Sequence, residues 1–246
     1  MADRHDPGRH DRVAAAAAPV MDVVVPTLDA AALLPATLAA LASSRDAGLI
    51  ARVIVSDGGS TDATPAVATA HGCAIVSAPR GRGPQLAAGA AAACAPWLLF
   101  LHADTVLATG WADAARRFIA QHDDCWPAAA VFRLCFDDPT GTARLLEALV
   151  ALRVRLFALP YGDQGLLISR RLYRDVGGFH PLPLMEDVDL VRRLGRRRLR
   201  VLDATAVTSA ARYRGAGYLW RMARNSLCLG MYFSGVQAAR IAKHYG

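Results

Sequence analysis

The alternation of short apolar segments with helical segments limits the folds open to this chain more than any other feature. Apolar runs predict four strands in the first half, at residues 21–25, 52–56, 73–76 and 97–101. Helical spacing predicts a helix after each of them, at residues 30–43, 61–71, 84–94 and 111–121. Strands and helices in this order form a parallel sheet whose crossover connections are helices.

The second half of the chain is less regular but continues the same pattern. It predicts strands at 128–136, 166–169 and 199–202, and helices at 142–159, 171–176 and 187–194. A length of 246 residues suits one large domain, because a single hydrophobic core grows to about 250 residues. We therefore expect a single α/β domain with a mostly parallel central sheet flanked by helices.

The two ends of the chain depart from this pattern. Residues 1–19 carry charges, proline and glycine before a short alanine run, which predicts a disordered leader, with Met21 as an alternative start. We expect the main domain at 20–214 and an amphipathic helical segment at 215–246. Residues 218–236 are aromatic and apolar, but their uncharged stretch is too short to span a bilayer. They predict either a helix packed on the domain or one lying on a membrane surface.

Charge and cysteine content narrow the classes of partner. The net charge of +7 favours anionic ligands such as nucleotides, phosphates or acidic lipid surfaces. The sequence has no platform of aromatic and basic residues, so nucleic acid is not an expected partner. The five cysteines are odd in number and include no CxxC pair, which argues against a disulfide framework or a structural zinc site. The expected location is the reducing cytoplasm.

Polar residues follow the first two predicted strands. Pro26, Thr27 and Asp29 come after the first, and Asp57 with two glycines comes after the second. Parallel sheets bind ligands beyond the carboxyl ends of their strands, so these residues are candidates for a binding site. Asp57 can accept hydrogen bonds from a base or a ribose, and the glycines let the backbone approach a ligand. Each group alone would also suit an ordinary turn and helix cap.

Two further segments carry charged residues in the same half. Arg82 and Gln85 belong to the segment RGRGPQ at the start of a helix, which suits an anion site or a solvated basic loop. His102 and Asp104 follow the fourth strand, which is apolar throughout. Oxygen ligands suit Mg²⁺ or Mn²⁺, so Asp104 is the predicted metal ligand and His102 a candidate second ligand.

The second half contributes one acidic segment and one polar turn. Glu186, Asp187 and Asp189 lie together before an amphipathic helix. Three carboxylates in four residues repel one another unless a ligand or the helix N-terminus stabilises them, and both explanations remain open. The polar turn Gly162-Asp163-Gln164 precedes a predicted apolar strand.

In this order, the segments resemble the family 2 glycosyltransferases with the GT-A fold. The matching segments, between Met21 and Arg214, are VVVPTLDA, VSDGGSTDAT, RGRGPQ, LLFLHADT, GDQGLLISRRLYRDVGGF and LMEDVDLVRRL. Each is weakly specific alone, whereas six in one order are strongly specific. The chain is especially similar to the small bacterial members described as radical-SAM/selenodomain-associated transferases.

The resemblance implies a role for each candidate residue. Nucleotide-sugar contacts would come from Pro26, Thr27, Asp29, Asp57, Arg82, Gln85 and Asp104. The acceptor side would include Gly162, Asp163, Gln164 and Glu186. Asp104 corresponds to the last aspartate of the family's metal-binding DxD-like motif, and His102 replaces the first. Asp187 corresponds to the usual catalytic base.

The resemblance also implies a reaction. Asp187 would deprotonate the acceptor in an inverting displacement, while Mg²⁺ or Mn²⁺ neutralises the leaving nucleoside diphosphate. UDP-sugar is the family's usual donor. The acceptor is unknown. A lipid-linked acceptor would fit membrane contact through residues 218–236, at the inner face of the membrane in bacterial cell-envelope or polysaccharide synthesis.

Other classes of protein fit the sequence less well. A nucleotidyltransferase would carry a glycine-rich, arginine-bearing loop after the first strand, and a dinucleotide dehydrogenase would carry GxGxxG there. This chain has PTLDAA instead, without a glycine. A catalytically degenerate fold would bind an anionic membrane or a partner through the arginine run at 192–200 and the C-terminal segment. The presence of Asp57, Asp104 and Asp187 argues against degeneracy.

Overall fold

The structure is a computed structural model, and it describes residues 20–122, 127–210 and 217–245. Its strands are β1 (Met21–Thr27), β2 (Ile50–Asp57), β3 (Ala74–Ser77), β4 (Trp97–Phe100), β5 (Thr105–Leu107), β6 (Ala129–Phe136), β7 (Leu166–Ser169) and β8 (Leu199–Thr208). Its helices are α1 (Leu34–Asp46), α2 (Thr64–Ala70), α3 (Arg82–Ala92), α4 (Trp111–Gln121), α5 (Gly141–Phe157), α6 (Arg170–Asp175), α7 (Glu186–Leu194), α9 (Tyr218–Phe233) and α10 (Ala238–Tyr245), with short 3₁₀ turns η1 (Gly162–Gln164) and η2 (Arg196–Arg198). The predicted leader at 1–19 and the predicted boundary at 214–215 lie outside the described residues.

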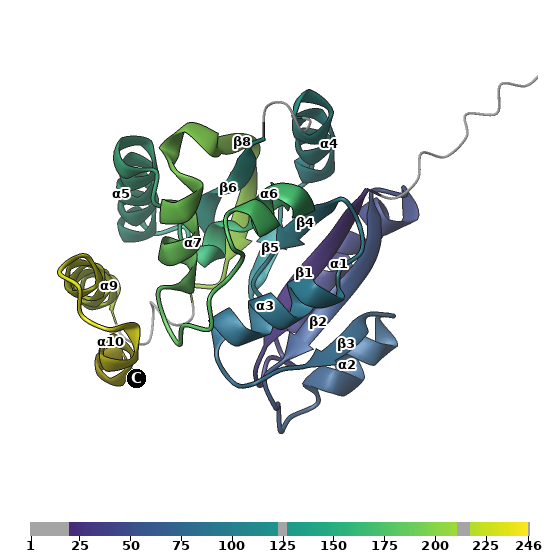
Figure 1. The fold of residues 1–246 in the computed structure, drawn as a ribbon, viewed down its shortest axis with the longest axis horizontal. Coiled ribbons are helices and arrows are strands. Elements are labelled where there is room, and N and C mark those ends of the chain that lie inside the picture. The colour runs from purple at the N-terminus through teal and green to yellow at the C-terminus, as the bar shows by residue number, and fades with distance from the viewer. Residues whose placement is uncertain (1–19, 123–126, 211–216, 246) are drawn as a thin grey trace, which may run out of the picture.

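One sheet carries all the described strands, in the order β3-β2-β1-β4-β7-β6-β8-β5 (Figure 1). Strand β1 pairs in parallel with β2 and β4, β2 with β3, and β6 with β8. Strand β7 is antiparallel to β4 and β6, and β5 is antiparallel to β8. The prediction of a mostly parallel α/β sheet is therefore confirmed. Strand β5 was not predicted, because three residues carry too little periodicity.

The first strand continues past Pro26, whereas the sequence predicted that proline would end it. Pro26 pairs with Ser56 of β2, and Thr27 pairs with Asp57. The amide of Leu101 donates to the carbonyl of Val24, so the backbone groups of Val24 and Pro26 face the β4 side. Strand β4 ends at Phe100, so the N–H that proline lacks would have had no strand to bond there. Proline is therefore tolerated within this strand.

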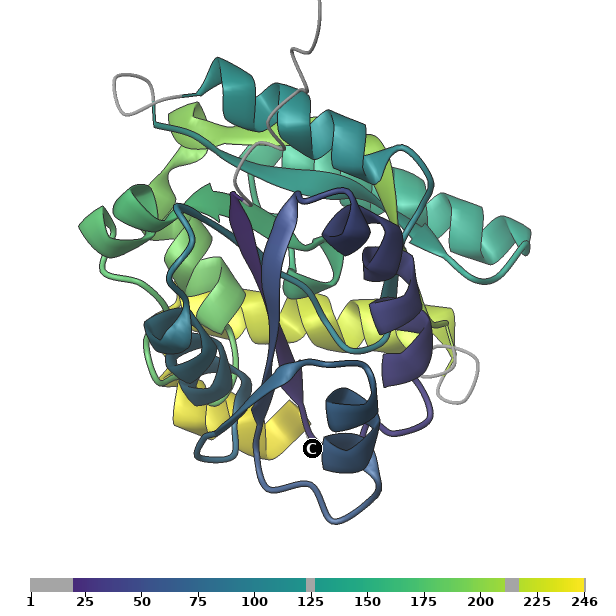
Figure 2. The ribbon, with the colours of Figure 1, turned by 90° about the vertical axis from the view of Figure 1, so that its right-hand side faces the viewer.

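Helices cover both faces of the sheet, as expected of buried parallel strands. Val23 and Val25 of β1 pack with α1, α2 and α4 on one face. Val24, between them, packs with α3, α6 and α7 on the other. Figure 2 shows β1 and β2 side by side with α1 and α3 on either side of them. This alternation explains why the β1 sequence is apolar throughout.

The C-terminal helices α9 and α10 pack against the domain. Cys228 of α9 and Ile241 of α10 are buried with Leu159, Met185 and Val188. This contact fits the prediction of a helix packed on the domain, although the outer face of α9 remains exposed. Among the residues that the structure describes, no helix is both long and apolar enough to cross a membrane.

Two glycine variants compare a tightly packed helix position, Gly89 in α3, with an open one, Gly230 in α9. A Cβ at Gly89 would lie 2.3 Å from Cγ1 of the buried Val24, so Gly89→Ala is expected to destabilise the fold by about 1–3 kcal/mol. Gly230 in α9 has nothing within 4 Å of such a Cβ, so Gly230→Ala is expected to gain about 0.5–1 kcal/mol from helix propensity. Urea unfolding measures both. Equal effects of the two variants would contradict this packing.

Candidate active site

The carboxyl ends of β1, β2 and β4 meet at one edge of the sheet because these strands are parallel neighbours. A cleft lies at this edge. Its walls include Pro26, Thr27, Asp29, Arg80, Arg82, Gln85, His102 and Asp104, with Pro183 and Leu184 from the loop before α7. The structure therefore brings most of the predicted nucleotide-sugar residues to one cleft, which we call the donor cleft.

Asp57 is not among the residues that line the donor cleft. One of its carboxylate oxygens accepts hydrogen bonds from the hydroxyls of Thr27 and Ser60, and the other accepts from the amides of Gly59 and Ser60. Burial acts to raise the pKa of Asp57, but these hydrogen bonds, led by that of Ser60, hold it below its usual value. The carboxylate thus stays ionised and fixes the turn after β2.

Asp29 joins this turn to the loop after β1. Its backbone is left-handed, with φ of 48°, and its amide donates to the hydroxyl of Ser60 at 2.9 Å. Its Oδ1 accepts from the amide of Thr61 at 2.8 Å. Aspartate tolerates this backbone region better than most residues, because its side chain can bond nearby amides. The two loops are therefore held in one arrangement by each other's side chains.

Gln85 supports the same edge from α3. Its side chain is buried and donates to the carbonyls of Thr27 and Ser56, the latter at 3.1 Å. A Cβ at Gly58 would lie 2.9 Å from this amide nitrogen, so glycine leaves the space that Gln85 fills. Gln85 lines the donor cleft, but its donor hydrogen atoms are used to bridge the ends of β1 and β2.

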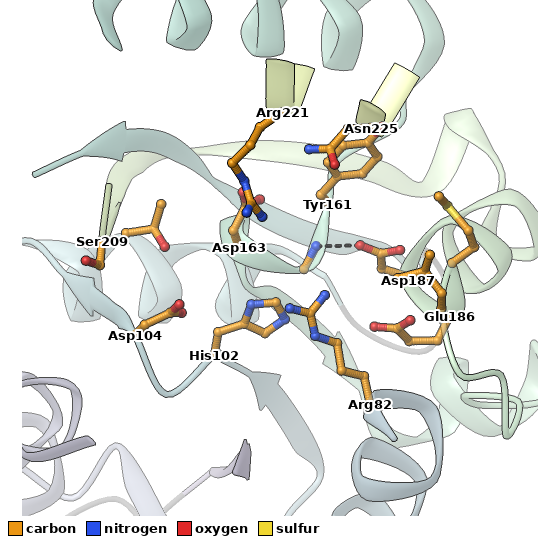
Figure 3. A pocket seen from close by; sticks show the side chains of 14 residues that line it. Arg82, His102, Asp104, Tyr161, Asp163, Glu186, Asp187, Ser209, Arg221 and Asn225 are labelled. Atoms are coloured by element: carbon orange, nitrogen blue, oxygen red, sulfur yellow. Dashed lines mark hydrogen bonds between the residues drawn. The ribbon is translucent and has the colours of Figure 1, made fainter. Parts of the chain in front are cut away.

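A second pocket adjoins the donor cleft, and we call it the inner pocket (Figure 3). The two spaces share Arg82, His102, Asp104 and Leu184. The inner pocket is also lined by Tyr161, Gly162, Asp163, Met185, Glu186, Asp187, Thr208, Ser209, Arg221 and Asn225. A ligand that fills both spaces would pass the side chains of Arg82, His102 and Asp104.

Asp187 is held at the wall of the inner pocket by two backbone amides. Its Oδ2 accepts from the amide of Gly162 at 2.8 Å, and its Oδ1 accepts from the amide of Val188 at 2.7 Å. Gly162 has no room for a side chain, since a Cβ there would lie 2.5 Å from Nε2 of His102. Met185, just before α7, is left-handed with φ of 65°, a strained geometry that recurs at functional sites.

Family comparison agrees with this arrangement. The model of the family described as "Glycosyl transferase family 2" matches residues 22–157, which is more than half of the chain. The chain belongs to this family. It is therefore a glycosyltransferase, as the sequence predicted. Among curated proteins, no match to the chain was found.

Solved structures similar to this glycosyltransferase share its fold. Glucosyl-3-phosphoglycerate synthase from Mycobacterium tuberculosis, with Mn²⁺, UDP and glucosyl-3-phosphoglycerate, is 21% identical, with a TM-score of 0.53 over 84% of this chain and 77% of that chain. S. aureus TarS 1–349 is 18% identical, with a TM-score of 0.60 over 78% and 60% of the two chains. A further mycobacterial protein is 22% identical, with a TM-score of 0.54 over 78% and 66%. This glycosyltransferase thus spans about two thirds of that protein's length.

The polar turn η1 divides its residues between two environments in the glycosyltransferase. Gly162 and Asp163 line the inner pocket. Gln164 is buried instead, is not among the lining residues, and donates to the carbonyl of Phe132 at 3.0 Å. The side chain of Gln164 therefore braces η1 against β6, and its predicted place beside the acceptor stays a prediction.

Two buried carboxyl groups of the inner pocket have raised pKa values. Burial, reinforced by the charge of Asp187, raises the pKa of Glu186 from 4.5 to about 7. Burial also raises the pKa of Asp163 from 3.8 to about 6, against the opposing charge of Arg153. Asp163 is partly exposed as a residue, but its Oδ1 is enclosed, and neither this atom nor Oε2 of Glu186 has a hydrogen-bond partner.

The raised pKa of Glu186 predicts a pH-dependent stability. The folded state keeps a proton that the unfolded state loses between pH 4.5 and about 7, so stability falls as the pH rises through this window. Glu186→Gln removes this loss. Relative to wild type, the variant is expected to gain about 3 kcal/mol between the low and the high end of the window. Urea unfolding in metal-free buffer measures this gain, and parallel pH profiles would contradict it.

The donor atoms at the junction suit a divalent cation. Asp104 lines both spaces, and Asp163, Glu186 and Asp187 add carboxylates to the inner pocket. In the described part of the chain, no three His, Cys, Asp or Glu side chains are grouped closely enough to hold a metal by themselves. Mg²⁺ is commonly held by one or two carboxylates together with water and substrate phosphates, so a single carboxylate such as that of Asp104 is compatible with such a site.

The predicted site residues did not include seven that line the inner pocket: Tyr161, Leu184, Met185, Thr208, Ser209, Arg221 and Asn225. Tyr161 precedes η1, Ser209 follows β8, and Arg221 and Asn225 project from α9, where Arg221 reaches toward Asp163 (Figure 3). Arg221 and Asn225 are four residues apart, so they share one face of α9. A polar pair four residues apart on a largely apolar helix is a sequence signal that could have indicated a functional face.

Proposed function

We propose that this glycosyltransferase moves a sugar from a nucleoside-diphosphate sugar, with UDP-sugar as the first candidate, to an acceptor hydroxyl with inversion at the anomeric carbon. One observation carries the proposal. The donor cleft and the inner pocket meet at Arg82, His102 and Asp104, and Asp187 faces the inner pocket beyond that junction. The nucleoside would occupy the donor cleft near Pro26, Thr27 and Asp29, the diphosphate would lie at the junction, and the acceptor would enter the inner pocket.

Asp187 is the proposed general base. The amides of Gly162 and Val188 orient its carboxylate toward the inner pocket. A base held in this way can remove the acceptor's proton as the hydroxyl attacks the anomeric carbon. Glu186 and Asp163 are the proposed acceptor-side contacts, because both line the inner pocket and each has a carboxyl oxygen without a hydrogen-bond partner in the protein.

Arg82 and a divalent cation are the proposed partners of the diphosphate. Arg82 lies at the start of α3, where helix amides and a guanidinium together favour an anion. Asp104, with His102, would hold Mg²⁺ or Mn²⁺, which when bound neutralises charge on the leaving diphosphate. Support comes from the related synthase, whose structures contain UDP with Mn²⁺ or with Mg²⁺.

The proposal extends to the cellular setting. Residues 20–214 are the proposed catalytic domain and 215–246 a helical extension, with 1–19 as a leader. The acceptor is lipid-linked and is reached at the cytoplasmic face of a bacterial membrane through 218–236, during cell-envelope or polysaccharide synthesis. Exposure of Trp220, Leu227 and Phe233 on α9 supports this contact. The proposed subgroup is the radical-SAM/selenodomain-associated one, on the strength of the sequence resemblance.

A nucleotide panel tests the donor. UDP, GDP, CDP and dTDP are each added with and without Mn²⁺, and thermal unfolding is followed. UDP with Mn²⁺ is expected to stabilise the fold by about 2.7 kcal/mol at a hundredfold excess over Kd, because a ligand of the folded state alone shifts unfolding by mass action. A larger shift with another base would reassign the donor. No shift with any nucleotide would contradict transfer and favour a degenerate fold that binds anionic membrane.

A further inference from the structure

The outward face of α5 is an apolar stripe exposed to solvent. Leu145, Leu149, Leu152 and Leu156 are 39–58% exposed, and Phe157 at the end of the helix is 66% exposed. Steps of four, three and four residues place the four leucines on one face of the helix. We call these five residues the α5 stripe. The opposite face already supplies the core contacts of α5, through Leu146, Val150 and Val154.

Positive charge accompanies the α5 stripe. Arg144 and Arg155 are exposed on α5, whereas the helix's one acidic residue, Glu147, is mostly covered and pairs with Arg144 at 2.7 Å. Arg196 donates to the carbonyls of Leu156 and Arg155 and so fixes η2 at the C-terminal end of α5. Exposed Arg155, Arg196, Arg197 and Arg198 form what we call the arginine cluster. Phe157, the most exposed residue of the α5 stripe, thus lies beside several cations.

We propose that the α5 stripe and the arginine cluster dock on the surface of a bilayer that contains anionic lipids. A helix with exposed leucines and flanking arginines lies in the plane of the interface, with its apolar side chains at the acyl boundary and its cations at the phosphates. A second copy of the chain is a poorer occupant, because pairing this surface would bring two arginine clusters of a +7 chain together. This surface is separate from residues 218–236, which the sequence singled out.

The same helix connects this surface to the inner pocket. The guanidinium of Arg153, on α5, lies 3.6 Å from the centre of the Tyr161 ring, and Tyr161 lines the pocket. An α-helix with its side chains is about 10–12 Å across. A docked α5 therefore holds the pocket wall about one helix diameter from the lipid, which suits an acceptor that is anchored in the membrane.

Vesicle co-sedimentation tests the apolar part of this surface. The full chain is mixed with phosphatidylcholine vesicles with and without phosphatidylglycerol. Wild type is expected to sediment with the anionic vesicles, and the double variant Leu149→Glu with Leu152→Glu is expected to lose at least about tenfold in affinity. The matched control is Ile75→Glu, since Ile75 is similarly exposed, at 40%, on β3 at the far edge of the sheet. Unchanged melting temperatures establish that the variants are folded.

A second variant tests the contribution of the arginine cluster to vesicle binding. Arg197→Gln with Arg198→Gln is expected to weaken binding to anionic vesicles by roughly ten- to thirtyfold, and the loss should shrink at high salt. Wild type that stays in the supernatant with anionic vesicles would overturn the proposal, as would unchanged sedimentation of the leucine variant. A dimer in light scattering that the leucine variant abolishes, without vesicle binding, would assign the surface to self-association. No sugar nucleotide is present, so the result is independent of the transferase proposal.

Discussion

Replacing Asp187 with asparagine is expected to lower the rate of sugar transfer by about 10²- to 10⁴-fold, the range typical of a lost general base. Asparagine keeps an oxygen acceptor for only one of the two amides that orient Asp187, those of Gly162 and Val188, and it cannot take up a proton. The measurement is release of nucleoside diphosphate from the sugar nucleotide that the nucleotide panel identifies. Nucleotide binding should persist, because Asp187 lines the inner pocket and is not among the residues of the donor cleft.

The matched control for this variant is Asp175→Asn. Asp175 is exposed on α6, where it forms a long ion pair of 3.9 Å with Arg171. It should retain wild-type activity and stability. A wild-type rate in Asp187→Asn would remove this residue from the role of base and leave Asp163 and Glu186 as the nearest alternatives in the pocket.

Replacing Asp104 with asparagine is expected to abolish the metal-dependent part of nucleotide binding. Asp104 is the carboxylate that lines both the donor cleft and the inner pocket, and the amide of asparagine is a much weaker cation ligand. At a hundredfold excess of nucleotide and Mn²⁺ over Kd, the variant should lose about 2.7 kcal/mol of ligand-induced stabilisation. Thermal unfolding with and without Mn²⁺ measures this loss, and the transfer rate should fall with it.

The control is Asp113→Asn, which alters an exposed carboxylate at the start of α4, outside both spaces. This variant should keep the full metal-dependent stabilisation by nucleotide. An undiminished metal-dependent shift in Asp104→Asn would show that the cation is held elsewhere. A shift that needs no metal in wild type would contradict the metal assignment altogether.

Predictions about the elements of the fold succeeded where the chain is strongly periodic. Helix α4 and strand β7 have the predicted bounds, and the other predicted strands and helices differ mainly at their ends. Ends are set by pairing partners, as β8 illustrates: it runs on to Thr208 because it pairs with both β6 and β5. The sequence of β8 alone predicted an end at Leu202, since later residues lack strong apolar alternation.

The roles of the predicted site residues stay predictions, but the structure does bring several of them together. Thr27, Asp29, Arg82 and Asp104 do line one cleft. The direction of a side chain was harder to predict. Asp57 was predicted to contact a ligand, but its carboxylate accepts hydrogen bonds from the turn after β2, and the side chain of Gln85, although it lines the cleft, donates to the ends of β1 and β2. The sequence does not show which of several possible partners a polar side chain will hydrogen-bond, because those partners are brought together only by the fold.

The family, the α/β sheet and the edge of that sheet where the donor cleft lies could all be predicted from the sequence, because they follow from local periodicity and from motifs of contiguous residues. Only the tertiary structure decided that Arg221 and Asn225 of α9 enter the pocket of Asp187 and that the leucines of α5 remain exposed. Both outcomes depend on which face of each helix packs against the rest of the domain. A helix with two apolar faces, such as α5, can bury only the one that the sheet covers.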